Sequence, residues 1–292
     1  GGIAMDIFVY GIINSVTLSL LSLGFTLVYS ISRLPNFAHG ALYITTGYFI
    51  WLFLNGLGLS YPLAIMLGIA LTSLIGAMMY RLILIRIRGM EISEIIATYA
   101  IGLAIIEGLR WGGLRGTTFT LPSFASGSRD ILGVSVDDQR LLVVVVGFAV
   151  FALLHLFVHL TRNGLALRGI AQDERAAMML GIDSDRMAVV SFAIGSSLAG
   201  LSAALILPLG NIVVEAGYNV LLFSIAVCVI GGLGSWTGAI IASFLIGFAQ
   251  ILTEKFLSAH FQMVIALLAI IITLLIKPSG ILGRQKELEE RV

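Results

Sequence analysis

Apolar runs long enough to cross a membrane recur along this chain, and they limit its fold more than any other feature. The first run, Ile7–Tyr29, contains no charged residue. A helix needs about 20 apolar residues to cross a hydrocarbon core roughly 30 Å thick. Charged residues make up 11% of the chain, against about 25% in soluble domains, so the polar surface of a water-soluble globule is missing. We therefore predict an all-α, polytopic transmembrane helical bundle.

The positions of the runs predict about eight or nine membrane segments within one domain, residues 5–283. Gly1–Ala4 precede Met5, a candidate start, and are left out of this prediction. The last two segments before the final one are short for a full crossing and flank a glycine-rich stretch, which indicates a broken or re-entrant region. The predicted segments are Ile7–Tyr29, Ala38–Leu54, Pro62–Ile85, Ile92–Leu109, Leu141–Leu160, Met187–Leu207, Asn219–Ile230, Ala239–Leu252 and Met263–Ile276.

The placement of Arg and Lys predicts the orientation, because loops facing the cytoplasm carry an excess of these residues. With the N-terminus outside, 12 of the 17 basic residues fall on the cytoplasmic side. They lie partly in residues 161–186, a long internal loop, and in residues 284–292, a charged cytoplasmic tail. Residues 111–139 then form a long external loop. We expect an external N-terminus and a cytoplasmic C-terminus.

The internal loop, residues 161–186, has the pattern of a short amphipathic helix. Asp173 is suited to the first helical turn, where the helix dipole favours negative charge. Ala176 and Ala177 place small side chains on one side, and Gly181 is a natural stop. Such a helix is suited to docking into a groove of another protein. The alternative, a surface helix that only covers the bundle, is equally compatible with the residues.

A second informative segment, residues 34–41, interrupts apolar sequence with proline, asparagine and glycine. Irregular backbone at membrane depth is tolerated where it lines a cavity or is buried in protein. Asn36 and His39 in this break are therefore candidate elements of a solute pathway. The alternative is a cytoplasmic turn in which Asn36 caps the following helix.

The third segment, residues 229–239, carries four glycines within eight positions, Gly231, Gly232, Gly234 and Gly238. Small residues allow helices to pack closely in lipid. The segment is no phosphate-binding loop, because the lysine that should follow the last glycine is missing.

Other chemistry has little support in the residues. His155 and His159 share a helix face, but no Asp, Glu or Cys accompanies them as a metal ligand. Ser235 lacks the Gly-x-Ser elbow of a hydrolase, and the titratable groups that a membrane-embedded hydrolase needs do not cluster. An ion channel needs rings of charge or a filter repeat, and the sequence has neither. No Walker motif occurs, so we predict a non-catalytic chain without a metal or cofactor of its own.

Taken in order, three motifs resemble branched-chain amino acid ABC-transporter permeases. The opening residues 23–29 and 33–40 are similar to the first signature of that family, and residues 176–182 resemble its coupling loop. The stretch Ile230–Gly238 resembles its glycine-rich segment. The resemblance extends from about Ile12 to Gly283 and is to the shorter of the two permease subunits that such systems carry.

This resemblance implies an importer in the inner (plasma) membrane with two permeases, two cytoplasmic ATPases that bind ATP and Mg²⁺, and an external substrate-binding protein. It implies no nucleic-acid partner. The cargo can be a branched-chain or other hydrophobic amino acid; urea, short amides and aromatic acids stay open. Arg175 stands where the wider superfamily has Glu, which puts individual ATPase contacts in doubt. The implied ATPase-coupling residues are Arg168, Gln172, Asp173, Ala176, Ala177, Gly181 and Ile182. The implied translocation-path residues are Asn36, Phe37, His39, Gly40, Gly231, Gly232, Gly234 and Ser235.

The predicted orientation can be tested with single cysteines in a Cys228→Ser background. An impermeant thiol reagent applied to intact cells should label Ser126→Cys in the external loop and spare Asp173→Cys in the internal loop. Labelling of position 173 with protection of position 126 would show that the orientation is reversed.

Overall fold

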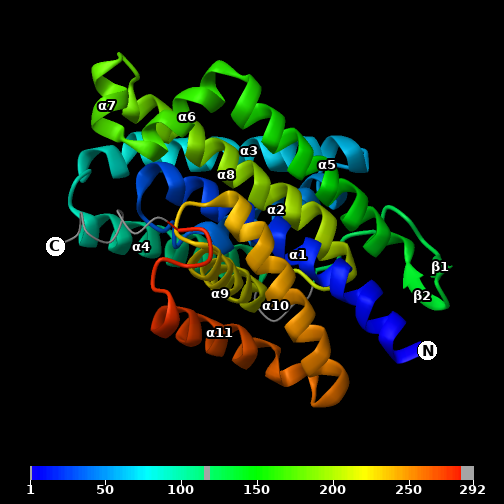
Figure 1. The fold of residues 1–292 in the computed structure, drawn as a ribbon. Coiled ribbons are helices and arrows are strands. Elements are labelled where there is room, and N and C mark those ends of the chain that lie inside the picture. The colour runs from blue at the N-terminus through cyan, green and yellow to red at the C-terminus, as the bar shows by residue number, and fades with distance from the viewer. Residues whose placement is uncertain (1, 115–118, 284–292) are drawn as a thin grey trace.

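The computed structural model describes residues 2–114 and 119–283, and its helices agree with a polytopic transmembrane bundle (Figure 1). Eight helices of this part of the chain are long and apolar enough to cross a membrane. The helices are α1 (Gly2–Ser32), α2 (His39–Asn55), α3 (Tyr61–Leu82), α4 (Glu91–Leu109), α5 (Asp138–Leu160), α6 (Arg162–Gln172), α7 (Glu174–Met179), α8 (Ser184–Ile206), α9 (Val214–Gly231), α10 (Trp236–Phe256) and α11 (Gln262–Ile276).

All nine predicted membrane segments coincide with helices. Eight of them are the helices long enough to span. The other one is α2, whose 17 residues lie at the lower limit for a crossing. Helices α9 and α10 are longer than predicted, with 18 and 21 residues, so both are long enough to span. The turn between them is confined to residues 232–235. The predicted tail, residues 284–292, lies outside the described residues.

The connections gather at two opposite ends of the bundle. At the end that carries α7, here called the α7 end, Arg33 donates a hydrogen bond of 2.8 Å to the carbonyl of Ala171. At the other end, the hairpin end, Tyr10 donates to the carbonyl of Ser135 over 2.8 Å. Figure 1 shows α7 and the two strands at opposite sides of the molecule. This grouping of connections is the one that the alternation of predicted segments requires.

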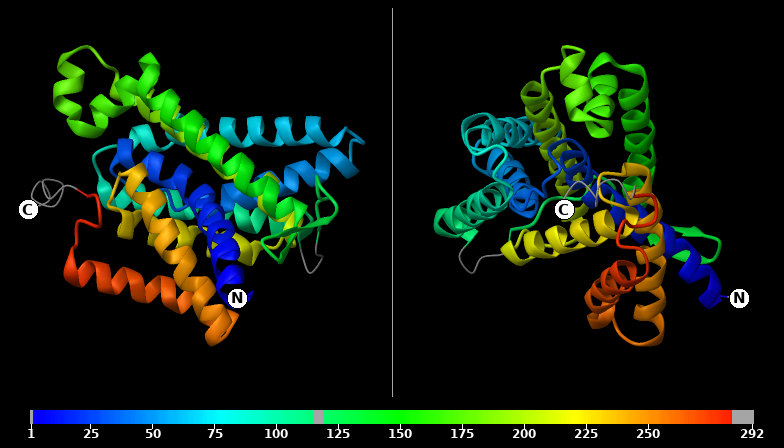
Figure 2. Two further views of the ribbon diagram at one scale, coloured as in Figure 1. Left: turned by 45° about the vertical axis from the view of Figure 1, so that its right-hand side comes forward. Right: turned by 60° about the vertical axis from the view of Figure 1, so that its left-hand side comes forward.

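Helix α1 is the centre of the bundle and α11 is at its margin. In the most apolar part of α1, 67% of the residues are buried. In the span Ala259–Ile276, which ends with α11, only 6% are buried. Helix α1 packs against α8, α9, α10 and α5, and both views in Figure 2 place α11 on the side of the bundle opposite to α5 and α6. The apolar outer face of α11 is typical of a helix in contact with lipid.

Small residues let the helices approach one another closely. A Cβ added to Gly40 in α2 would lie 1.9 Å from the carbonyl oxygen of Gly217 in α9. A Cβ added to Gly24 in α1 would lie 2.4 Å from the carbonyl oxygen of Gly195 in α8. In lipid, where apolar side chains gain little by associating with each other, such close backbone packing is a main source of helix association.

Buried hydroxyl groups are satisfied mainly by backbone carbonyls. Ser202 in α8 donates to the carbonyl of Leu20 in α1 over 2.8 Å. Ser224 in α9 donates to the carbonyl of Leu21 over 3.0 Å. These hydrogen bonds connect α1 to two neighbouring helices and pair both hydroxyls within the apolar layer.

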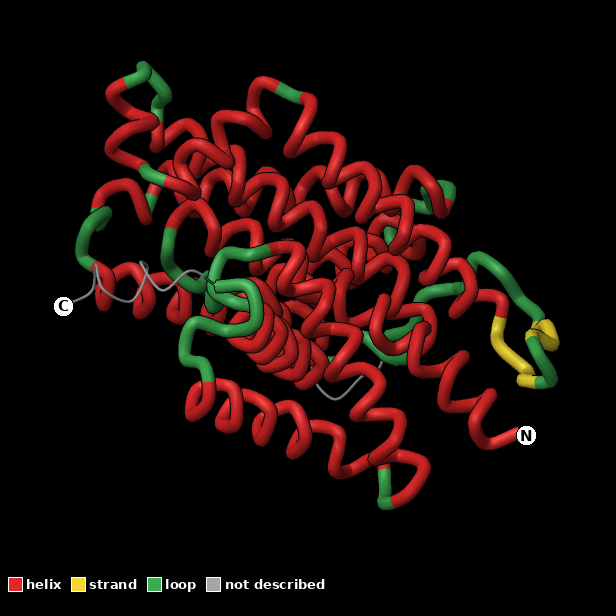
Figure 3. Tube along the Cα trace, viewed as in Figure 1, coloured by secondary structure: helices red, strands yellow, loops and turns green. Residues whose placement is uncertain are grey.

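The loop of residues 111–139 contains a β-hairpin that was not predicted from the sequence (Figure 3). Strand β1 (Ser128–Ile131) pairs antiparallel with β2 (Val134–Asp137). Leu132 and Gly133 form the turn with positive φ angles of 54° and 81°, as in the turns that suit the twist of a hairpin. Val134 and Val136 point into an apolar cluster with the start of α1, and this alternation within a four-residue strand is too short to stand out in the sequence.

The contact between Gly40 and Gly217 predicts that a single methyl group at position 40 destabilises the bundle. Gly40→Ala should cost about 1–3 kcal/mol of folding free energy because the added carbon meets backbone rather than a movable side chain. The measurement is the thermal midpoint of the purified chain in detergent. Gly108→Ala is the control, because a Cβ there meets nothing within 4 Å. Equal midpoints for the two variants would contradict the close approach.

Candidate functional site

The predicted coupling segment folds as two short helices rather than one. The hydroxyl of Thr161 caps α6 by accepting a 3.0 Å hydrogen bond from the N–H of Gly164. The carboxylate of Asp173 caps α7 by accepting a 2.9 Å hydrogen bond from the N–H of Ala176. Asp173 therefore precedes the first turn of α7 instead of belonging to it, and its extended backbone (φ −155°, ψ 104°) separates the two helices.

The end of α7 is fixed by Gly181, as predicted. Gly181 has a φ of +85°, and its N–H donates to the carbonyl of Met178 over 2.9 Å. The next N–H, that of Ile182, donates to the carbonyl of Ala177 over 3.1 Å. This pair of hydrogen bonds is the Schellman motif, in which a glycine at the left-handed position ends the helix.

Ala177, predicted to contact a partner, does not face outward in this structure. Its side chain is 3% exposed and belongs to an apolar cluster with Ile31, Leu167, Ile170 and Met187. A helix of six residues has few side chains with which to contact the bundle. The small side chain at 177 allows α7 to lie close to α6. Ala176 is exposed on the other side.

Large apolar side chains occupy the outward surface of α7 and its C-cap. Met179 is 90% exposed and Leu180 is 83% exposed, while Met178 is 46% exposed. Figure 1 shows that α7 projects from the bundle at its end. None of these three residues belongs to the coupling set that the family resemblance implies. Exposed apolar side chains at the tip of a projecting helix are typical of a docking surface.

A cavity of about 430 Å³ lies where α6 meets the glycine-rich turn. It brings together Arg168 and Gln172 from the predicted coupling set with Gly234 and Ser235 from the predicted path set. Within the described part of the chain, the buried Nε of Arg168 has no hydrogen-bond partner. Ser235 also caps α10, since its hydroxyl accepts a 3.1 Å hydrogen bond from the N–H of Gly238. Residues of two sets predicted separately thus line one cavity of mixed polar and apolar surface at the α7 end.

In the helix break at residues 33–38, Asn36 and Ala38 are buried and the other residues are partly exposed. The side chain of Asn36, 2% exposed, accepts a 3.1 Å hydrogen bond from the N–H of Ala38. It thus closes a local turn, whereas α2 begins at His39. The ring Nε2 of His39 lies 2.8 Å from the carbonyl oxygen of Leu21, to which it donates. Both side chains are therefore held inside the bundle.

The remaining predicted path residues are divided between two places. Phe37 and Gly40 line a crevice of about 10 Å³ between α2, α4 and α9, next to Tyr99, which has room for about one water molecule. Gly231 is the last residue of α9 and Gly232 the first of the turn to α10, and both are buried. Of the predicted path residues, Gly234 and Ser235 line the larger cavity and Phe37 and Gly40 line the crevice, whereas the other four line neither.

The match to a known family covers most of the chain. Residues 7–274 match the family described as the permease component of branched-chain amino acid transport systems. The chain belongs to this family. Three similar proteins are the high-affinity branched-chain amino acid transport permeases LivH of Salmonella typhimurium and BraD of Pseudomonas aeruginosa, and the probable permease LivH of Methanocaldococcus jannaschii. The permease is 29%, 30% and 31% identical to them, over 95%, 94% and 93% of its own length and 96%, 94% and 90% of theirs.

A solved structure has a similar fold. The permease matches a chain of PsaBC from Streptococcus pneumoniae in complex with Fab, with a TM-score of 0.52 and 15% identity. The match covers 98% of the permease and 95% of that chain. At this identity the likeness concerns the arrangement of helices alone.

The geometry at Gly181 predicts how the permease responds to substitution there. Gly181→Val should loosen the end of α7, because a β-branched side chain at positive φ costs about 1–3 kcal/mol. Gly181→Asn is the matched control, since asparagine tolerates this conformation better than other side chains. Limited proteolysis should cleave residues 173–184 faster in the valine variant than in the asparagine variant. Equal cleavage rates would argue against a fixed left-handed glycine.

Proposed function

We propose that this chain is the membrane-spanning subunit of an ATP-driven importer for branched-chain or other hydrophobic amino acids. The observation that carries the proposal is the family match over residues 7–274, together with relatives named as branched-chain amino acid permeases over almost their whole length. In this proposal an external binding protein delivers the cargo, and a second permease subunit completes the transmembrane part. The protein lies in the inner (plasma) membrane with its N-terminus outside.

Energy enters through partners, because the chain has no nucleotide-binding motif. Two cytoplasmic ATPase subunits bind ATP and Mg²⁺ and dock at the α7 end. The exposed Met179 and Leu180 supply apolar anchors for a groove of the ATPase, and Ala176 beside them permits close approach. Ala177 and Ile182 act from within, since they hold α7 against the bundle.

The translocation path is proposed to run between the two permease subunits. The cavity with Arg168, Gln172 and Ser235 lies at the exit, where polar groups offer an amino acid hydrogen bonds after it leaves the apolar layer. Phe37 and Gly40 line the second crevice, nearer the helix break. The same architecture serves another cargo, such as urea, a short amide or an aromatic acid, if the binding protein selects it.

Charge at the tip of α7 tests the docking surface. A double variant, Met179→Glu with Leu180→Glu, should reach the membrane at the normal level, because both side chains are exposed. It should lose co-purification of the ATPase subunits, since burying two carboxylates in an apolar groove is strongly unfavourable. Leu132→Glu is the control, because Leu132 is 62% exposed at the hairpin end.

Two results would count against this assignment. The first is full ATPase recruitment by the double glutamate variant. The second is ATP hydrolysis by the purified chain without its partners, because the sequence provides no site for it.

A further inference from the structure

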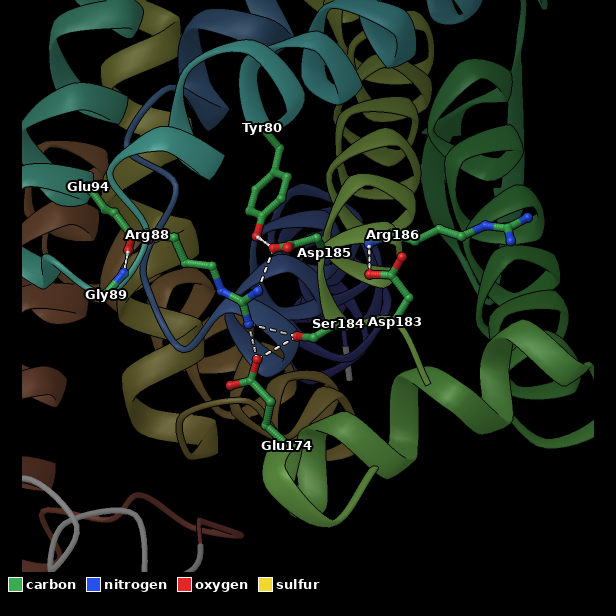
Figure 4. Close-up of polar contacts among 9 residues, drawn as sticks. All are labelled: Tyr80, Arg88, Gly89, Glu94, Glu174, Asp183, Ser184, Asp185 and Arg186. Carbon is green, nitrogen blue, oxygen red and sulfur yellow. Dashed lines mark hydrogen bonds and ion pairs between the residues drawn. The ribbon is translucent and has the colours of Figure 1, made fainter. Parts of the chain in front are cut away.

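Contacts around Arg88 connect four elements at the α7 end, namely α3, the connection between α3 and α4, α7 and α8 (Figure 4). It lies in the connection between α3 and α4, and its guanidinium forms ion pairs with Glu174 at the start of α7 and with Asp185 at the start of α8. It also donates to the hydroxyl of Ser184 over 2.9 Å, and Ser184 in turn donates to Glu174. Tyr80, near the end of α3, donates to the same Asp185 carboxylate over 2.9 Å.

The contacts continue from Arg88 into α4. The N–H of Gly89 donates to the carboxylate of Glu94, in the first turn of α4, over 2.8 Å. One turn further, the hydroxyl of Thr98 accepts a hydrogen bond of 3.3 Å from the N–H of Phe37. Helix α4 therefore connects the Arg88 cluster to the helix break.

Packing supports the same route. The rings of Phe37 and Tyr99 meet edge to face with centroids 6.4 Å apart. A Cβ added to Gly102 would lie 3.1 Å from the Cα of Ala38, so α4 lies directly on the backbone of the break. A displacement of α4 would therefore move the residues that border the crevice at Phe37 and Gly40.

We propose that Arg88 is a positioning residue that transmits movement of α7 to α4 and, through α4, to the helix break at residues 33–38. The proposal rests on the proposed function, because it takes α7 as the element that the ATPase moves. It assigns a role to a residue outside the coupling and path sets described above.

The chemistry of the cluster suits transmission better than anchoring. The side chains of Arg88, Glu174 and Asp185 are 35%, 39% and 40% exposed, and ion pairs at such exposure add little to stability. Arginine, however, presents a rigid fork of donors that fixes two carboxylates in a defined geometry. A cluster of this kind sets the relative position of α7, α8 and the α3–α4 connection while leaving the membrane core unchanged.

A matched pair of variants tests the proposal in the assembled transporter. Arg88→Gln should keep the membrane level, ATPase co-purification and ATP hydrolysis, but leucine taken up per ATP hydrolysed should fall by at least about fivefold, the lower range of allosteric coupling. Arg86→Gln removes the same charge two residues away, where the described residues offer no ion pair, and should behave as the wild type.

A second readout is independent of the cargo. Tyr99→Cys, in the Cys228→Ser background, places a thiol on α4 at a position that is 49% exposed. ATP should change its labelling rate in otherwise wild-type transporter and leave it unchanged when Arg88→Gln is added.

Three outcomes would overturn the inference. One is an uptake-to-hydrolysis ratio in Arg88→Gln equal to that in Arg86→Gln. The second is a parallel fall of membrane level, hydrolysis and uptake, which marks a purely structural tie. The third is a labelling rate at position 99 that ATP does not change in the otherwise wild-type transporter. Failure of the proposed function shows separately, as absence of ATP-driven leucine uptake by the wild-type transporter.

Discussion

The backbone of a helix in lipid must satisfy its own hydrogen bonds, because no water is available there, and this constraint governs the whole bundle. It leaves the packing of helices to small residues and short hydroxyl side chains rather than to a hydrophobic effect. Two features of the bundle follow from this constraint. One is the close contact of Gly40 with Gly217, and the other is the pair of hydrogen bonds from Ser202 and Ser224 to α1. The same constraint confines irregular backbone to the ends of the bundle or to buried sites.

The functional features follow from where that irregular backbone lies. The helix break near Asn36, the glycine-rich turn and helices α6 and α7 all lie at the α7 end. Arg33 bonds directly to the carbonyl of Ala171, and the cavity near Arg168 includes the turn at Ser235. The exposed apolar side chains of α7, the cavity and the break thus lie at the same end of the bundle. The proposed route through the Arg88 cluster connects α7 to the break.

Sequence reasoning predicted the parts of the structure that depend on local pattern. Hydropathy located all eight helices of the described residues that are long and apolar enough to span. Gly181 predicted the end of α7 because few residues other than glycine tolerate its positive φ. It misplaced Ala177, because a helical face in sequence does not tell which side meets the bundle. It missed the hairpin and the links from Arg88 to Glu174 and Asp185, which are 86 and 97 residues away along the chain. Such contacts depend on tertiary packing, for which a single sequence carries no local signal.

The account as a whole depends on coupling between ATP and solute movement across this chain. The most direct measurement is uptake of labelled leucine by vesicles that contain the permease, its partner subunits and the binding protein, with ATP supplied only on the α7 side. The account predicts uptake that requires both ATP on that side and the binding protein outside. Uptake that proceeds equally without ATP, or with ATP only on the hairpin side, would contradict it.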